Sequence, residues 1–227
     1  MKREGRGMLL YRAAQEGAFG RVTRFERGGI TDALFVYLDG EPEPESVEAL
    51  AAGYLARPWV CLTDAWESRI RERFQRAQVY VRTLMRPARR FSLPEQGPLP
   101  EGCRLAAMDE AAFNAHPFGH GANYPSYGAF QADGSGAVVW RDGEIVASAS
   151  SFLSLDGEVE LDVSTAEEYR GMGLATACAV AMLRDCAARG ITVHWDAQNA
   201  ASRRLAEKLG FAVDRVYPVY WVDAEEG

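Results

Sequence analysis

The residues best suited to chemistry lie in one glycine-rich run, YRGMGLAT, at residues 169–176. The run follows a predicted strand and begins a predicted helix, whose first backbone N–H groups have no partners within the helix. Because the helix dipole is positive at that end and glycine lets a ligand approach the backbone closely, a phosphate or pyrophosphate fits there. The predicted phosphate-binding residues are Arg170, Gly171, Met172, Gly173, Leu174, Ala175 and Thr176.

This pattern, Arg or Gln followed by x-x-Gly-x-Gly or Ala, is short, and it occurs a second time at residues 131–136, QADGSG. The second match precedes a strand and begins no helix, so we interpret it as a loop. A dinucleotide-binding fingerprint is excluded because Thr176 stands where that motif requires a small residue. A Walker P-loop is excluded because the sequence has no Gly-Lys pair.

The glycine-rich run needs a sheet before it and a buried helix after it. Residues 158–165 predict a strand with Glu158, Glu160, Asp162 and Ser164 on one side and apolar side chains between them. Residues 173–189 predict an almost wholly apolar helix that is buried on most sides. Other patterns predict strands at 103–108, 137–140, 145–152, 191–195 and 211–222, and helices at 110–114, 124–130 and from Asn199 to Leu209.

A smaller α/β unit precedes this one. It has predicted strands at 33–38, 59–62 and 78–85 and helices around 47–55 and 64–74, the second capped by Asp64. Six prolines and glycines between Pro87 and Gly102 exclude a helix or a central strand there and indicate a linker. We therefore predict an N-terminal subdomain at 1–98 and a second domain at 99–227.

Composition and charge narrow the function. The 227 residues are 48% apolar and 25% charged, which is typical of a globular protein. No apolar run approaches the ~20 residues that span a bilayer, and the N-terminal sequence does not resemble a signal peptide. Four cysteines form no CxxC pair and no metal-ligand spacing, so we expect reduced thiols, no bound metal and a cytoplasmic location. Residues 101–227 carry a net charge of −10, which argues against nucleic acid or an anionic membrane as partner.

A family resemblance rests on several motifs together. The strand at 158–165, the glycine-rich run with its helix, the next strand and the sequence NAASRRLAEKLGF at 199–211 resemble the GNAT superfamily of acyl-CoA N-acyltransferases over residues 103–227. The sequences ELDVST at 160–165 and WDAQN at 195–199 resemble, more narrowly, the branch with the zwittermicin A resistance acetyltransferases, over most of residues 8–222. The resemblance implies an α+β (mixed α/β) GNAT fold with a central mixed, splayed β-sheet flanked by helices.

The resemblance also implies a site for acetyl-CoA, where the sheet opens between the predicted strands 158–165 and 191–196. Pantetheine would pair like a strand with the backbone of Val163, Ser164 and Thr165, and the pyrophosphate would lie on the amides of 170–176. Asn199 would reach the pantetheine or the thioester from the opposite wall, with Ser202 of the same helix as a further contact.

Acetyl transfer to nitrogen requires a neutral amine, so the resemblance implies a proton acceptor near the thioester. Glu160 is the first candidate for this general base and Asp162, on the same side of the strand, is the second. The alternative is that both carboxylates only solvate an amphipathic strand. Many GNAT enzymes have a tyrosine as general acid where this sequence has Ala206. Tyr217, Tyr220 or water is then the expected proton donor to the leaving thiolate.

The predicted acceptor is a small, cationic molecule with a primary amine. The domain is acidic, and the narrower resemblance is to enzymes that act on an aminopolyol antibiotic. Tyr124, Tyr127 and Trp195 are candidate substrate contacts, and a core position is the alternative for Trp195. A peptide or protein amine is the second choice of acceptor. The transferred acyl group could also be other than acetyl. The competing class of function is a CoA-binding module without turnover. We expect a monomer or a homodimer.

Overall fold

The computed structural model describes residues 7–88, 93–95, 97–118 and 123–224. Contacts between residues divide the chain into two compact units, the first made of Met1–Arg82 and Val216–Gly227 and the second of Thr83–Arg215. The boundaries fall inside two long strands, β5 (Gln78–Pro87) and β11 (Phe211–Trp221). The sequence-based division into a subdomain at 1–98 and a domain at 99–227 stays a prediction.

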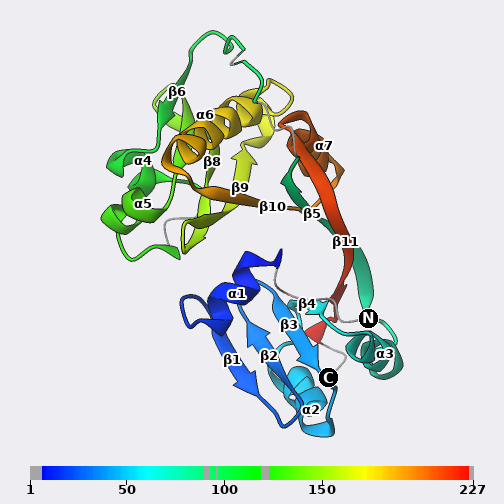
Figure 1. Cartoon of the computed structure of the whole chain (residues 1–227). Helices are drawn as coiled ribbons and strands as arrows, with labels where there is room; N and C mark the ends of the chain where they lie inside the picture. The colour runs from blue at the N-terminus through cyan, green and yellow to red at the C-terminus, as the bar shows by residue number, and fades with distance from the viewer. Residues whose placement is uncertain (1–6, 89–92, 96, 119–122, 225–227) are drawn as a thin grey trace. The chain divides into compact units, whose positions relative to one another are not determined.

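The second unit is built on a mixed sheet (Figure 1). Its order is β11-β5-β10-β9-β8-β7-β6, with β6 (Cys103–Ala107), β7 (Gly136–Arg141), β8 (Glu144–Leu155), β9 (Glu158–Thr165) and β10 (Thr192–Ala197). Strands β6 to β9 are antiparallel neighbours, β9 and β10 are parallel, and β10 and β5 are antiparallel. The strands predicted at 137–140 and 145–152 form an antiparallel hairpin, and the predicted mixed α/β architecture is confirmed.

Strands β9 and β10 pair only at their beginnings. Their register runs from Thr192 opposite Glu158 to His194 opposite Glu160, whereas β9 continues to Thr165. Beyond that point β9 stays paired with β8, as far as Thr165 opposite Ala147, and the rest of β10 pairs with β5. The sheet therefore opens between β9 and β10, as predicted for a splayed sheet.

Helix α6 (Leu174–Arg189) covers one face of this sheet, chiefly over β7 and β8 (Figure 1). Its apolar sequence predicts this burial, and its buried side chains join a core with those of the strands. The helix ends at Gly190, whose φ of 71° lies in the left-handed region that glycine adopts readily. Core members from helix and sheet include Leu174, Cys178, Leu183, Val139, Ala149, Val159 and Trp195.

The second unit also contains α4 (Glu110–Ala115), α5 (Tyr127–Asp133), the 3-10 helix η3 (Glu167–Tyr169) and α7 (Ala200–Lys208). The predicted cap of α7 is confirmed, because Asn199 Oδ1 accepts a hydrogen bond from the Ser202 amide at 3.0 Å. The helix predicted at 124–130 begins at Tyr127 instead. The reason is its cap, since the hydroxyl of Ser126 accepts from the Ala129 amide at 3.2 Å.

The strands of the first unit follow the order β1-β2-β3-β4-β11. Its elements are α1 (Leu9–Gln15), β1 (Arg21–Arg24), β2 (Gly28–Asp32), β3 (Val36–Gly40), α2 (Pro44–Gly53), β4 (Pro58–Cys61) and α3 (Asp64–Arg73). Its core contains Trp59, Trp66, Ile70 and Phe74, so the apolar stripe of α3 is buried as its spacing predicts.

Three elements of this region differ in detail from the sequence analysis. Thr63, and not Asp64, caps α3, because its side chain accepts from the Trp66 amide at 3.4 Å. The strand expected at 33–38 begins at Val36. Finally, β11 is a single strand that passes through Pro218, where the sequence is compatible with either one strand or a strand pair interrupted at this proline.

Candidate active site

The glycine-rich run forms a tight turn at the start of α6. Gly171 and Gly173 have φ values of 78° and 79°, which side-chain-bearing residues rarely adopt. Gly173 is the N-cap residue, and no described side chain caps the helix. The N-cap residue therefore leaves the first-turn amides of α6 open to another acceptor, which is the arrangement that binds anions at helix N-termini.

A cavity of about 830 Å³, the large cavity, opens beside this turn. It is bounded by the end of β9, the glycine-rich run and the start of α7. Its described lining includes the cations Arg170 and Lys208 and no acidic side chain, although the chain as a whole has a net charge of −7. The lining residues are Phe118, Val163, Ser164, Thr165, Tyr169, Arg170, Gly171, Gly173, Leu174, Ala175, Thr176, Asn199, Ala201, Ser202, Leu205 and Lys208.

Most of the predicted cofactor residues thus lie together at one cavity, and their contact with a cofactor stays a prediction. Met172 is the exception, since it lines a neighbouring cavity of about 210 Å³, the side cavity. Phe118, Tyr169, Leu205 and Lys208 line the large cavity and were not predicted. Lys208 stands in the KLGF sequence that contributed to the family resemblance, so a signal for it was present.

The end of β9 offers the large cavity an open strand edge. Val163–Thr165 pair with β8 on one side, whereas the ladder to β10 has stopped at Glu160. The buried hydroxyl Oγ1 of Thr165 has no hydrogen-bond partner in the described part of the chain. Buried polar groups and strand edges are normally satisfied, so this edge suits an extended ligand with amide groups.

On the opposite wall, Asn199 and Ser202 are part of a hydrogen-bonded chain. The carbonyl oxygen of the Asn199 side chain caps α7, which leaves its NH₂ group as the donor for a ligand. Ser202 Oγ accepts from Trp195 Nε1 at 3.0 Å. Trp195 is only 2% exposed and packs edge-on against Phe211, so in this structure it supports the wall from the core and is not part of the lining.

The two predicted bases lie where β9 and β10 separate. Glu160 is 7% exposed and occupies the last position at which β9 pairs with β10, opposite His194. His194 itself is bonded to Glu158. Asp162 is half-buried, accepts from Ser164 Oγ at 3.1 Å and lies opposite the buried Ser150 of β8. The burial of Glu160 does not fit a carboxylate that only solvates an amphipathic strand; a catalytic role for Glu160 or Asp162 stays a prediction.

Tyr124 and Tyr127 lie away from the large cavity's lining. The Tyr124 hydroxyl bonds to Ser154 at 2.5 Å, and burial raises the pKa of Tyr124 to about 12. Tyr127 stacks on Phe130 and lines a third cavity, of about 450 Å³, between α5, the edge of the sheet and the end of α6. The structure therefore does not bring these two tyrosines together with the predicted cofactor residues.

Ala206, at the position of the tyrosine in many GNAT enzymes, and the two candidate tyrosines for the general acid are all buried. Ala206 is a fully buried core residue of α7. Tyr217 and Tyr220 are 3% and 0% exposed and belong to the first unit. Burial raises the pKa of Tyr220, whose hydroxyl accepts a hydrogen bond from Arg71.

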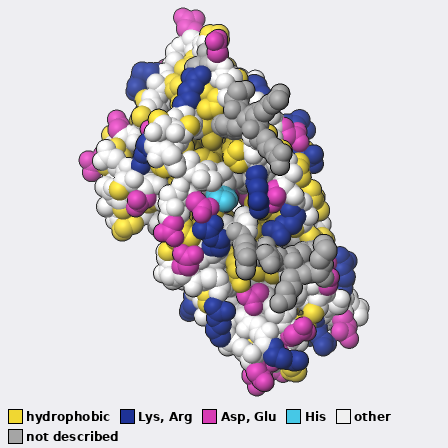
Figure 2. Space-filling model, viewed as in Figure 1, with side chains coloured by type: hydrophobic (Ala, Val, Ile, Leu, Met, Phe, Trp, Pro, Cys, Tyr) yellow, Lys and Arg dark blue, Asp and Glu magenta, His cyan; other side chains and the backbone are white. Residues whose placement is uncertain are grey.

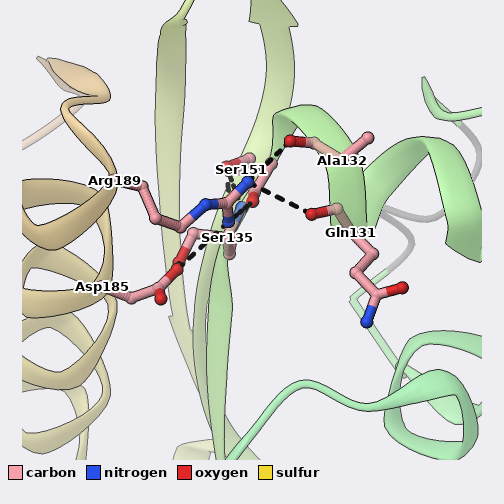
Figure 3. A network of polar contacts seen from close by, with 7 residues as sticks. Gln131, Ala132, Ser135, Ser151, Asp185 and Arg189 are labelled. Carbon is pink, nitrogen blue, oxygen red and sulfur yellow. Dashed lines mark hydrogen bonds and ion pairs between the residues drawn. The ribbon is translucent and has the colours of Figure 1, made fainter.

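The second Gln-x-x-Gly-x-Gly match has a structural explanation, seen in Figure 3. It ends α5, and the guanidinium of Arg189 donates to the carbonyls of Gln131, Ala132 and Gly134 at 3.1, 2.7 and 2.6 Å. Asp185 accepts from Arg189 and from Ser135, at 3.2 and 2.8 Å. This network ties the end of α5 to the C-terminal end of α6. The match begins no helix, as the sequence indicates, but the prediction of a loop is wrong for Gln131–Asp133, which are the last residues of α5.

Some chemistries find no support in the described residues. The described residues include no group of three or more His, Cys, Asp or Glu side chains that could hold a metal ion. All four cysteines are free, and burial raises the pKa of Cys186 to about 11 and that of Cys178 to about 12. No helix in the described ranges is long and apolar enough to cross a membrane.

Comparison with known proteins identifies the family. The profile of the family described as GNAT acetyltransferase matches residues 17–220. An uncharacterized N-acetyltransferase of Bacillus subtilis (strain 168), YdfB, is 33% identical over 129 residues, which make up 54% of this chain. Those residues are 49% of YdfB, so the chain spans about half the length of this curated relative.

Solved structures show the same fold. The crystal structure of a GCN5-related N-acetyltransferase-like protein from Streptococcus suis 89/1591 has a TM-score of 0.79 at 25% identity, covering 93% of this chain and 92% of that one. A GCN5-related N-acetyltransferase from Kribbella flavida has a TM-score of 0.63 at 17% identity, covering 93% and 95%.

Proposed function

Because the chain belongs to the GNAT acetyltransferase family, we propose that it transfers an acetyl group from acetyl-CoA to the primary amine of a small, cationic molecule. The large cavity carries this proposal, since its described lining combines the uncapped start of α6 with two cations and no acidic side chain. Such a lining suits an elongated ligand with phosphates. Acetyl-CoA would supply the activated acetyl thioester.

Different residues of the large cavity would bind different parts of the cofactor. The amides of Gly171–Thr176 would hold the pyrophosphate, because they lie at the positive end of a 16-residue helix whose N-cap, Gly173, has no side chain to cap it. The backbone of Val163–Thr165 and the Thr165 hydroxyl would bind the pantetheine amides. The free NH₂ group of Asn199 would donate to pantetheine or the thioester from the α7 side.

Glu160 is the proposed general base. It is buried at the last paired position before the sheet opens, where a carboxylate is shielded from water. In direct transfer the amine nitrogen bonds to the acetyl carbonyl carbon, the bond from that carbon to sulfur breaks, and the amine proton passes to Glu160 directly or through water. Asp162, two residues further toward the opening, is the second candidate.

The proton for the leaving thiolate is proposed to come from water. Ala206 replaces the tyrosine found in many relatives and is buried, so α7 offers no donor at that position. Tyr217 or Tyr220 is the alternative, and the burial of both speaks against it.

Carboxylates support the proposal of a cationic acceptor. Glu158, Glu160 and Asp162 lie on β9 beside the opening of the sheet, and the narrower resemblance to zwittermicin A resistance enzymes points to the same class. Figure 2 shows acidic and basic side chains interspersed on the visible face, so the attraction is attributed to these local carboxylates and not to the surface as a whole. A peptide or protein amine is the second choice of acceptor.

Two further readings of the same site remain open to experiment. Ala206 motivates a CoA-binding or regulatory module with little turnover, and the lining of the large cavity does not by itself select acetyl over longer acyl groups. We also propose that the enzyme is cytoplasmic and that it is a monomer or a homodimer.

Release of free thiol from acetyl-CoA tests the activity, with a panel of polycationic, neutral and acidic amines. Glu160→Gln should lower the rate about 100-fold while CoA still binds, because it keeps the side chain's shape and removes the base. Glu144→Gln, the same change at an exposed position of β8, is the control. Thermal stabilisation by CoA without thiol release from any amine would favour the binding module. A Glu160→Gln rate close to wild type from pH 6 to 9 would move the role to Asp162 or water.

A further inference from the structure

The third cavity, of about 450 Å³, lies apart from the proposed active site. It is bounded by the edge of the sheet at β6, the end of α5 and the C-terminal half of α6, and it shares no described lining residue with the large cavity. Helix α6 has 16 residues and is therefore about 24 Å long, with the glycine-rich run at its start. A cavity of this volume is large enough for a small organic molecule.

One side of the third cavity carries a negative charge. Asp185 accepts from Ser135 at 2.8 Å and from Arg189 at 3.2 Å, both through Oδ2, so its Oδ1 is open to a further donor. The guanidinium of Arg189 also donates to three carbonyl oxygens at the end of α5 (Figure 3). Both α5 and α6 end here, and helix C-termini carry partial negative charge, so the single arginine leaves a net negative charge around Asp185.

The other side of the third cavity is aromatic and apolar. Tyr127 stacks on Phe130, with ring centroids 6.3 Å apart, and Phe130 belongs to the same buried cluster as Met108. The sequence QADGSG at 131–136 allows this packing, because a Cβ at Gly136 would lie 3.1 Å from both Phe130 and Met108. Ala181 of α6 contributes a small side chain to the lining. Apolar groups pack against such a wall, and the faces of aromatic rings also attract cations.

The edge of β6 supplies polar backbone groups. β6 is the last strand in the sheet order and pairs with β7 on one side. The Met108 amide donates to the Gly136 carbonyl at 2.9 Å, which fixes the alternation of the antiparallel ladder. The backbone groups of Leu105 and Ala107 therefore face away from β7. Both residues line the third cavity, so a ligand there can reach outward-facing N–H and C=O groups.

We propose that the third cavity is a second binding site, and that its ligand is a small organic cation with an apolar or aromatic body. The ammonium group would donate to Asp185 Oδ1, and the body would pack on Tyr127 and Phe130. An anion is repelled by the carboxylate and by the two helix ends, and a neutral molecule of the same shape loses the charge-assisted hydrogen bond. The site is independent of acetyl transfer, because its described lining contains no residue assigned to the donor or to the general base.

Calorimetric titration with N,N-dimethyl-2-phenylethylamine tests the assignment. This molecule is a cation at neutral pH and, as a tertiary amine, forms no amide, so its binding is separate from turnover. The wild type should bind it about tenfold or more tightly than 2-phenylethanol or 3-phenylpropionate, as expected for one hydrogen bond to a charged group. Asp185→Asn, which keeps an acceptor for Ser135 and removes the charge, should reduce the affinity for the cation to that for the alcohol. Asp156→Asn, the same change in the exposed turn between β8 and β9, is the matched control and should leave the affinity unchanged.

Ala181→Leu provides a second reading that leaves every charge in place. The larger side chain fills part of the third cavity and should lower the affinity for the cation about tenfold or more. Ala188→Leu, at an exposed position of α6 outside the lining, should not change it. Saturating CoA and Glu160→Gln should both leave cation binding unchanged, because the large cavity and the proposed base lie elsewhere.

The outcomes separate this site from the proposed active site. Equal affinity for the cation and the alcohol, or no binding of the cation by the wild type, overturns the inference. Unchanged affinity in folded Asp185→Asn or in folded Ala181→Leu also overturns it, and Ala181→Leu decides alone where Asp185→Asn does not fold. Loss of binding in Glu160→Gln would place the cation at the acceptor position and overturn the second site. Absence of acetyl transfer in a chain that binds the cation overturns the proposed function alone.

Discussion

Gly173 and Gly190 provide a matched pair of substitutions at the two ends of α6. Both have left-handed φ values, 79° and 71°, and an added Cβ would meet no atom within 4 Å at either position. Replacing either with alanine therefore costs about 1–2 kcal/mol of backbone strain, without a clash. For a chain of this size each kcal/mol lowers Tm by about 2–4 °C, so the two ligand-free variants should melt at similar, reduced temperatures.

Ligand binding should separate the two variants. At 100 times its Kd, CoA stabilises a protein by about 2.7 kcal/mol, or about 5–10 °C for a chain of this size. Gly190→Ala should keep this shift, because Gly190 ends α6 away from the large cavity. Gly173→Ala should lose most of it, because its new methyl group lies where a phosphate would approach the first-turn amides. Equal CoA shifts in two folded variants would refute the assignment of the glycine-rich run to the pyrophosphate.

Three more expectations concern stability and the acceptor. Arg189→Ala should lower the free energy of unfolding by about 2 kcal/mol, because it removes charge-assisted bonds to the end of α5. Arg203→Ala, which breaks only an exposed pair with Glu207, should cost about 0.5 kcal/mol or less; similar losses in denaturant titrations would contradict the structural weight given to Arg189. Because the pKa of Tyr124 is raised to about 12, the folded state holds this proton more tightly than the unfolded state, so stability should fall between pH 10 and 12 and fall less in Tyr124→Phe. Finally, the second-order rate with a polyamine should fall as salt rises, because screening shortens the field to about 8 Å at 0.15 M; a rate independent of salt would refute electrostatic steering.

The elements around the large cavity were predictable because their signals are local. The apolar run of α6 is too long and too uniform for a surface helix, and Gly190 marks its end. Asn199 followed by an amphipathic segment predicts the cap and direction of α7 without tertiary information. The alternation in 158–165 predicts β9, and its position before the glycine-rich run places both at one end of the sheet.

The remaining features depend on contacts between distant residues. Alternation puts Glu160 on the polar side of its strand but does not show whether that side is exposed; in the fold, where β9 pairs with both β8 and β10, Glu160 is only 7% exposed. Phe118 reaches the large cavity from the segment between α4 and α5, which carries no periodic pattern. Tyr124 bonds to Ser154, thirty positions away, and no local pattern signals that contact. A single sequence reports local periodicity and caps, and it does not report which distant side chain covers a given carboxylate.

The distribution of charge along β9 matches the two substrates proposed for this site. Glu158, Glu160 and Asp162 lie among the first five residues of the strand. Val163–Thr165, which line the large cavity, are uncharged. The cations Arg170 and Lys208 lie beyond them. A cationic amine and an anionic acyl donor would therefore be attracted to opposite ends of one strand, which agrees with the proposal that they react near the position where β9 and β10 separate. Reversing this order, with acids on the cavity side, would repel the phosphates from the start of α6, so the placement of these carboxylates serves donor binding as well as acceptor binding.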